Sequence, residues 1–154
     1  MLEPSTDAIV SPPATWLEPH GEYRIRLRVP TPPPGKELPF RLVLTQVPSR
    51  EDIVSGHVVL AVTQSIPVFA EPEALPPPSL NAPIGGPRQL VFRNDGGRRI
   101  RVSHIVQDGR DLMPGLAGYV LGGSALHVDL NAPIHRGRIE FDTDLGPRAL
   151  DAAN

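Results

Sequence analysis

The chain has 154 residues, a formal net charge of −2 and a hydrophobic content of 40%. This length fits one ordinary domain or two small ones with a real core. The small net charge predicts no strongly acidic or basic partner, and the lack of cysteine excludes disulfides and thiolate metal sites. No apolar run reaches the about 18 residues of a membrane-spanning helix, and residues 1–7 have neither the basic nor the apolar region of a signal peptide.

Proline content and periodicity both favour β-structure. Proline occurs 20 times; it breaks helix interiors but is tolerated at strand edges, strand starts and turns. Period-two alternation recurs along the chain, whereas no stretch shows the i, i+3, i+4, i+7 spacing of an amphipathic helix. Short strands separated by clusters of Pro, Gly, Asn and Asp predict an all-β sandwich or barrel.

The first predicted elements are short. A strand at residues 9–10 ends in the proline-containing turn 11–13. Residues 23–29 alternate cleanly, with aromatic and aliphatic side chains on one face and arginines on the other, and this pattern predicts a half-buried strand with a basic outer face. The proline-rich segment 30–36 is then expected to be a loop.

The longest apolar run, residues 57–69, carries most of the functional information. Fully extended, it spans about 40 Å at about 3.3 Å per residue, whereas ordinary strands have about 5–6 residues. With residues 40–48 it predicts a long antiparallel hairpin, closed by the polar loop 49–56. Its large aliphatic side chains share one parity: Val58, Leu60, Val62 and Ile66. The smaller side chains of the other parity, Val59 and Ala61 among them, are expected to face inward.

Two interpretations of this run remain open from the pattern alone. A central strand of a sandwich buries both of its faces, and periodicity does not locate such a strand. An edge strand instead presents its backbone and its large side chains to another protein, which then pairs with it by β-augmentation.

The composition changes after this run. Residues 72–87 are mostly Pro, Gly, Ala and Asn and predict a linker, or a loosely paired first strand after a linker. The sequence Asn-Asp-Gly-Gly at 94–97 strongly predicts a tight turn, because these residues tolerate positive φ. Short strands are predicted around and after it, at residues 89–93, 98–106, 118–121, 124–130 and 138–142.

No catalytic, metal-binding or nucleic-acid-binding constellation emerges. The five histidines are scattered without metal-ligand spacing. Ser124 follows two glycines but lacks a G-x-S-x-G elbow, and Asp142 and Asp144 share a face as alternate residues of any strand do. The basic group at 98–101 is expected on a solvated strand face, because aromatic content is only 5% and net charge is negative. We therefore expect no enzyme, no metal or other cofactor and no nucleic-acid partner.

The order and spacing of several short motifs match one family. The first half contributes SPP at 11–13 with LEP at 17–19, then FRLVL at 40–44 with VP at 47–48, then SIPVF at 65–69. The second half contributes NDG at 94–96, GYVLGGS at 118–124 and DLG at 144–146. Over nearly the whole chain these motifs resemble the periplasmic chaperones of chaperone–usher pilus assembly, the PapD-like proteins, and within them the Csu and spore-coat-U-type branch.

This resemblance implies two immunoglobulin-like β-sandwich domains. Residues 1–72 correspond to the C-terminal part of the first domain, 73–87 to a Pro/Gly-rich linker and 88–154 to the second domain. In the family, the seventh strand of the first domain lends alternating apolar side chains to a pilus subunit that lacks a strand. The donor residues implied here are Val58, Leu60, Val62 and Ile66.

The resemblance also implies partners and a compartment. The expected partners are pilus or fimbrial subunits and an outer-membrane usher, in the periplasm, with no membrane insertion. The alternative, from another class, is a structural or adhesive immunoglobulin-like module of a secreted protein, with the long strand central in its sheet.

Three departures from the family pattern stand out. The opening strands of the first domain and its anchoring arginine have no counterpart before Val10, which implies an N-terminally truncated chaperone. Pro67 stands where the family has a lysine for the subunit's C-terminal carboxylate, which implies a different anchor. Glu37 and Asp144 match the acidic members of the family's interdomain contact, but Glu71 stands where its basic member is expected.

Overall fold

The structure, a computed structural model, describes residues 3–48, 56 and 58–152. Strands account for all of its regular secondary structure, and no helix in this part of the chain is long and apolar enough to span a membrane. The chain divides into two units. Unit 1 comprises the described residues up to Pro32 together with Leu38–Ala70, and unit 2 comprises Pro33–Glu37 and the described residues from Glu71 onward.

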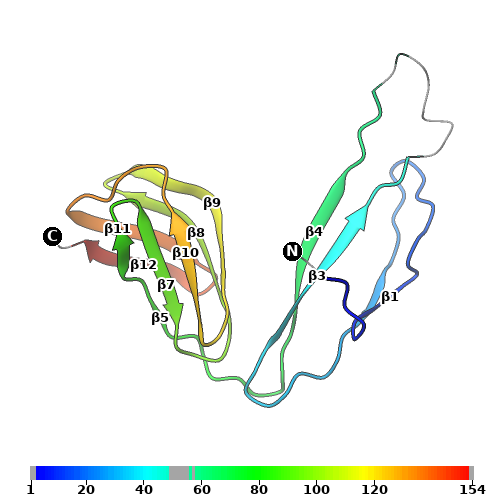
Figure 1. The fold of residues 1–154 in the computed structure, drawn as a ribbon, viewed down its shortest axis with the longest axis horizontal. Coiled ribbons are helices and arrows are strands. Elements are labelled where there is room, and N and C mark those ends of the chain that lie inside the picture. The colour runs from blue at the N-terminus through cyan, green and yellow to red at the C-terminus, as the bar shows by residue number, and fades with distance from the viewer. Residues whose placement is uncertain (1–2, 49–55, 57, 153–154) are drawn as a thin grey trace. The chain divides into compact units, whose positions relative to one another are not determined.

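Unit 1 consists of two separate antiparallel pairs of strands. Strand β1 (Ile9–Ser11) pairs with β2 (Arg26–Arg28), and β3 (Leu38–Thr45) pairs with β4 (Thr63–Ala70). Figure 1 shows β3 and β4 as a long two-stranded ribbon. Strands β2 and β4 are shorter than the sequence patterns predicted. β2 occupies three residues of the 23–29 run, and β4 begins at Thr63 rather than near His57. His57 and most of the expected loop 49–56 lie outside the described residues.

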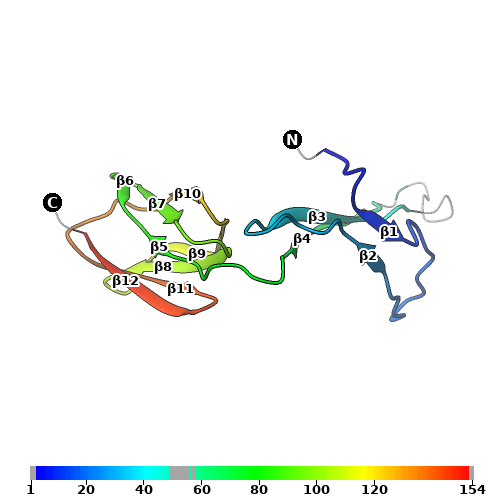
Figure 2. The same cartoon turned by 90° about the horizontal axis from the view of Figure 1, so that it is seen from below.

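Unit 2 is a sandwich of two four-stranded antiparallel sheets. In the first sheet, β7 (Gln89–Asn94) pairs with β10 (Ser124–Asp129) on one side and with β5 (Leu80–Asn81) and β6 (Ile84–Gly86) on the other. The second has the order β12-β11-β8-β9. Its strands are β8 (Ile100–Gln107), β9 (Arg110–Val120), β11 (Gly137–Thr143) and β12 (Gly146–Ala152). Figure 2 shows β6, β7 and β10 on one side of the unit and β11 and β12 on the other.

Residues 80–86 show that part of the Pro/Gly-rich segment 72–87 is paired. Leu80 lies opposite Asn94 and Ile84 opposite Leu90, so β5 and β6 follow one edge of β7 in succession. Pro83 lies between them and accepts a hydrogen bond from the Val91 backbone at 3.0 Å. A proline is compatible with this position because Pro83 lies in the interruption between β5 and β6, outside either strand.

The core of the described residues lies between the sheets of unit 2. Its buried side chains come from β7 to β12 and from the 130–132 loop: Leu90, Phe92, Ile100, Val102, Ile105, Leu112, Val120, Val128, Leu130, Ala132, Ile139, Phe141 and Ala152. Phe92 and Phe141 meet edge to face, with ring centroids 5.0 Å apart. Inward-facing residues of β8 and β11 alternate with exposed ones, the pattern of a sheet with one buried face.

The prediction of a tight turn with a return strand at the Asn-Asp-Gly-Gly segment is wrong: the segment is a bend that links two different sheets. None of residues 94–97 has positive φ. Asn94 is instead buried and binds four backbone groups, and the chain packs closely at the glycines. A Cβ on Gly96 would lie 2.1 Å from the Pro77 carbonyl oxygen. The following strand, β8, pairs with β9 and β11 rather than returning along β7, so the segment crosses between the two sheets.

Candidate functional site

The β3–β4 ribbon is the candidate site because it carries the row of large aliphatic side chains. Its register runs without interruption from Leu38 opposite Ala70 to Thr45 opposite Thr63. The Gln46 backbone N–H donates to the Val62 carbonyl at 2.9 Å, which extends the ladder one pair beyond the strand. Among the described residues, β4 has β3 as its one partner strand, so its other edge is open.

The inward side of this ribbon belongs to the even-numbered residues. On β3 the half-buried side chains alternate with exposed ones: Leu38, Phe40, Leu42 and Leu44. Residues opposite each other in a ladder share a face, so Ile66 opposite Leu42 and Val68 opposite Phe40 lie on this side. The expectation that the parity of Val59 and Ala61 faces inward is therefore wrong along β4, where the large side chains take the inward parity.

The exposure of this row increases along the strand toward its N-terminal end. The exposed fraction is 41% for Ile66, 53% for Val62, 79% for Leu60 and 88% for Val58. Residues 58–62 precede β4 and belong to no strand. The row thus begins at the half-buried Val68 and becomes more exposed toward Val58, where its apolar side chains are left uncovered by the described residues.

A buried ion-pair network joins the two acidic residues that flank the ribbon. Glu37 immediately precedes β3, and Glu71 immediately follows β4. In unit 2, Arg99 Nη1 donates to Glu37 Oε2 at 2.5 Å and also to Glu71 Oε1. Arg98 Nε lies 3.4 Å from Glu71 Oε2. The Glu37 side chain is 3% exposed, and its Oε1 has no hydrogen-bond partner among the described residues.

Arg99 supplies the positive charge that pairs with both acidic residues within unit 2. Glu71 occupies the position where a base was expected, and Arg99 immediately precedes β8. The prediction of a solvated basic group is therefore wrong for Arg99, whose side chain is only 25% exposed. Burial alone would lower the pKa of Arg99, but hydrogen bonds with Glu71 and Glu37, reinforced by their charges, outweigh it and raise the pKa of Arg99 above its ordinary value.

Asp144, the other expected acidic contact, has a separate partner. Its Oδ1 accepts a hydrogen bond from the Arg101 backbone N–H at 3.0 Å. Asp142 faces His104, with Nδ1 and Oδ2 3.5 Å apart, while His104 Nε2 lies 3.1 Å from Asp111 Oδ1. Asp142 and Asp144 thus contact different groups. All three members of the His104 cluster are more than half exposed, and no group of described side chains is arranged to hold a metal ion.

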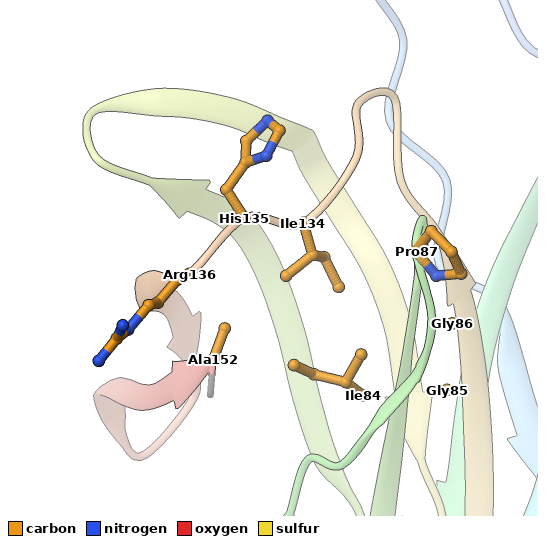
Figure 3. A pocket seen from close by; sticks show the side chains of 8 residues that line it. All are labelled: Ile84, Gly85, Gly86, Pro87, Ile134, His135, Arg136 and Ala152. Carbon is orange, nitrogen blue, oxygen red and sulfur yellow. The ribbon is translucent and has the colours of Figure 1, made fainter. Parts of the chain in front are cut away.

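One open pocket in unit 2 lies apart from these groups. It has a volume of about 440 Å³ and lies where β6, the 134–136 loop and the end of β12 meet. Figure 3 shows Ile84, Ile134 and Ala152 around the opening, while the Arg136 side chain extends away from it. The pocket therefore lacks the convergent polar groups of an active site.

Comparisons with known proteins agree with the sequence resemblance. Residues 2–76 match the family model of pili and flagellar-assembly chaperones, PapD N-terminal domain. The crystal structure of the E. coli chaperone DraB is similar, with a TM-score of 0.64 and 22% sequence identity, over 96% of this chain and 74% of that chain. A search of curated proteins gave no match. Residues 2–76 therefore resemble the N-terminal domain of pili and flagellar-assembly chaperones, and the chain shares the two-domain all-β fold of the E. coli chaperone.

Proposed function

We propose that this protein is a periplasmic chaperone that binds pilus or fimbrial subunits by donor-strand complementation and delivers them to an outer-membrane usher. The observation that carries the proposal is the open edge of β4, together with the uncovered apolar row that continues from it. An exposed strand edge with large side chains on one face is otherwise an aggregation hazard, which natural proteins cover or pair.

The physical basis is mutual completion of two incomplete sheets. A subunit that lacks one strand has unpaired backbone groups and an uncovered core. A lent strand pairs with that backbone, and its side chains enter the subunit's core. Each large aliphatic side chain that becomes fully buried contributes about 1.5–3 kcal/mol. Val58, Leu60 and Val62 are the proposed donor residues. Ile66 continues the row toward the C-terminal end of β4. This function needs no catalytic group and no cofactor.

The test places a charge in the middle of the row. The chain is produced in the E. coli periplasm, behind an added signal peptide, together with each member of a panel of incomplete immunoglobulin-like pilus subunits. The wild-type chain should yield a purified one-to-one complex with at least one subunit. Leu60→Asp should lower the recovered complex at least about tenfold, because a carboxylate would be buried without a partner.

Val47→Asp is the matched control, because Val47 is 82% exposed and lies outside β4. It introduces the same charge and should leave recovery of the complex unchanged. Equal loss in both variants would point to a general effect of charge, and unchanged recovery with Leu60→Asp would move the binding site away from this row. Failure of the wild-type chain to retain any subunit would contradict the proposed function itself.

A further inference from the structure

The backbone of β4 has two edges, and one hydrogen bond shows which residues face which edge. In an antiparallel ladder, residues alternate between pairs that exchange both backbone hydrogen bonds and pairs that exchange none. Because Gln46 donates to Val62, the pair of Gln46 and Val62 is of the bonded kind. With an unbroken register, even-numbered residues of β4 direct their N–H and C=O groups toward β3, and odd-numbered residues direct theirs to the open edge.

The two prolines of the ribbon agree independently with this assignment. Proline has no N–H and is tolerated in a strand only where no ladder bond is required. Pro39 lies opposite Phe69 and Pro67 opposite Arg41, so both prolines occupy odd positions, where the pair exchanges no bonds. Pro67 therefore removes no hydrogen bond from the β3–β4 ladder. It instead removes an N–H donor from the open edge of β4.

From these observations we infer that Pro67 is a specificity-determining residue that ends the pairing edge offered to a client strand. This inference rests on the proposed function. Thr63 and Ser65 direct N–H groups to the open edge, and the same alternation continued backward adds Val59 and Ala61. A client strand that ran past Ser65 would leave one backbone carbonyl without a donor at Pro67. An unpaired buried carbonyl is costly, so the client chain should end or turn away there.

The inference specifies what kind of client strand fits. The pairing edge from Val59 to Ser65 holds about seven residues, roughly 23 Å at about 3.3 Å each. A client segment of this length pairs fully, and additional residues toward Pro67 gain no ladder bonds. Pro67→Val restores a donor on the open edge without changing the inward row or the β3 ladder, so it should lengthen the pairing edge by two residues.

The experiment uses the full chain and Lys-capped peptides of alternating Thr and Val, with 5, 7, 9 and 11 central residues. Amide hydrogen exchange in the free chain should find the Gln64 and Ile66 amides protected and the Thr63 and Ser65 amides fast. Peptide binding should protect the Thr63 and Ser65 amides from exchange. For the wild-type chain, affinity should rise up to the seven-residue peptide and then remain constant.

Pro67→Val should bind the nine-residue peptide about threefold to tenfold more tightly than the wild type does, and the new amide at position 67 should become protected. Pro39→Val is the control, because it makes the same change at an odd position on the outer edge of β3. It should leave the length dependence on β4 unchanged. Variants that lose the wild-type exchange pattern of unit 2 are replaced by Pro67→Thr and Pro39→Thr.

The outcomes separate this inference from the proposed function. Peptides that protect Thr63 and Ser65 equally in wild type and Pro67→Val, with the same length dependence, would overturn the role of Pro67 and leave the proposed function in place. Peptides of every length that leave these two amides fast would overturn the open pairing edge, and with it both the inference and the proposed function. Fast exchange at Gln64 in the free chain would overturn the assignment of the two edges.

Discussion

The two units contain similar alternating sequences but bury them very differently. In unit 2 two four-stranded sheets enclose side chains such as Phe92 and Ile139, which have no exposed surface. In unit 1 the two strand pairs leave Ala70 as the one buried hydrophobic residue among those described. A hairpin alone is marginally stable, and a sheet must cover its apolar face. The packing of unit 2 therefore has a closed core, whereas the described strands of unit 1 leave their apolar faces largely uncovered.

This contrast explains why an exposed apolar row is informative in unit 1. Single exposed aliphatic residues are ordinary on any protein surface. The row from Val58 to Ile66 follows one parity, interrupted by Gln64, and adjoins an open strand edge; both features support the proposed donor role. The difference in burial between the two units can be tested by substitution.

The largest expected effect comes from the core of unit 2. Phe92→Ala removes a fully buried ring that contacts Phe141 edge to face, and it should lower the free energy of unfolding of unit 2 by about 3–5 kcal/mol. Phe40→Ala is the counterpart in unit 1, where the ring is half-buried on β3. Its cost should be below about 2 kcal/mol. Urea unfolding followed by circular dichroism and amide exchange measures both, and equal costs would contradict the contrast between the units.

A smaller effect is expected at the ion pairs of Glu37 and Glu71 with arginines within unit 2. Arg99→Met leaves the Glu37 carboxylate buried without its cation and should lower the unfolding free energy by about 3 kcal/mol, the low end for a broken buried pair because Arg99 is partly exposed. Arg98→Met is the matched control. Its bond to Glu71 is longer and more exposed, so its cost should stay below about 1 kcal/mol.

The pH dependence of this effect has a defined sign. The pKa of Arg99 is raised in the folded chain, so its stabilising contribution is fully present below the ordinary pKa of an arginine side chain and is lost only as pH rises through the raised value. The stability difference between wild type and Arg99→Met should therefore stay constant from about pH 7 to about pH 10. The double variant Arg99→Met with Glu37→Gln should recover part of the loss, since no buried charge is then left unpaired. A double variant as unstable as Arg99→Met would show that packing, rather than charge, accounts for the loss.

Local patterns predicted the all-β class and most of β7, β8, β10 and β11, because alternation and turn residues act over a few neighbouring positions. They missed β12 and predicted only the end of β9. They predicted the limits of the strands in unit 1 poorly. Residues 23–29 alternate throughout, yet β2 comprises only Arg26–Arg28, since the extent of a strand depends on its partner. The partner of Glu37 was missed for a related reason. Arg99 is 62 residues away, and nothing in its local sequence distinguishes it from the more exposed Arg98.

The parity of the donor row shows the same limit. The sequence separated the large side chains from the small ones, but the pattern of a single strand cannot say which face is inward. That information lies in the ladder with β3, where Ile66 lies opposite the half-buried Leu42. The inward face of β4 thus follows from its register with β3 and cannot be derived from the alternation of β4 alone.

The smallest of the three stability effects is expected at Asn94, where unit 2 joins its two sheets. Asn94 Oδ1 accepts hydrogen bonds from the Ser79 and Gly96 backbones, each at 3.0 Å. Its Nδ2 donates to the carbonyls of Arg98 and Val120, at 2.7 and 3.1 Å. Asn94→Ala leaves these four groups without the side chain and should lower the unfolding free energy by about 1–3 kcal/mol. The control Asn81→Ala removes one exposed hydrogen bond to Asp95 and should change it by less than about 0.5 kcal/mol.

Asn94→Asp sharpens this prediction because it changes only the donor half of the side chain. An aspartate keeps an acceptor for Ser79 and Gly96 but places its second oxygen against two carbonyl oxygens. It should therefore be at least as destabilising as Asn94→Ala in urea unfolding at neutral pH. If Asn94→Asp retained wild-type stability, the segment after β7 would depend mainly on its glycines, Gly96 packed on the Pro77 carbonyl and Gly97 on the Pro76 ring. Because unit 1 contains no comparable buried polar junction among its described residues, this loss should be confined to the unfolding transition of unit 2.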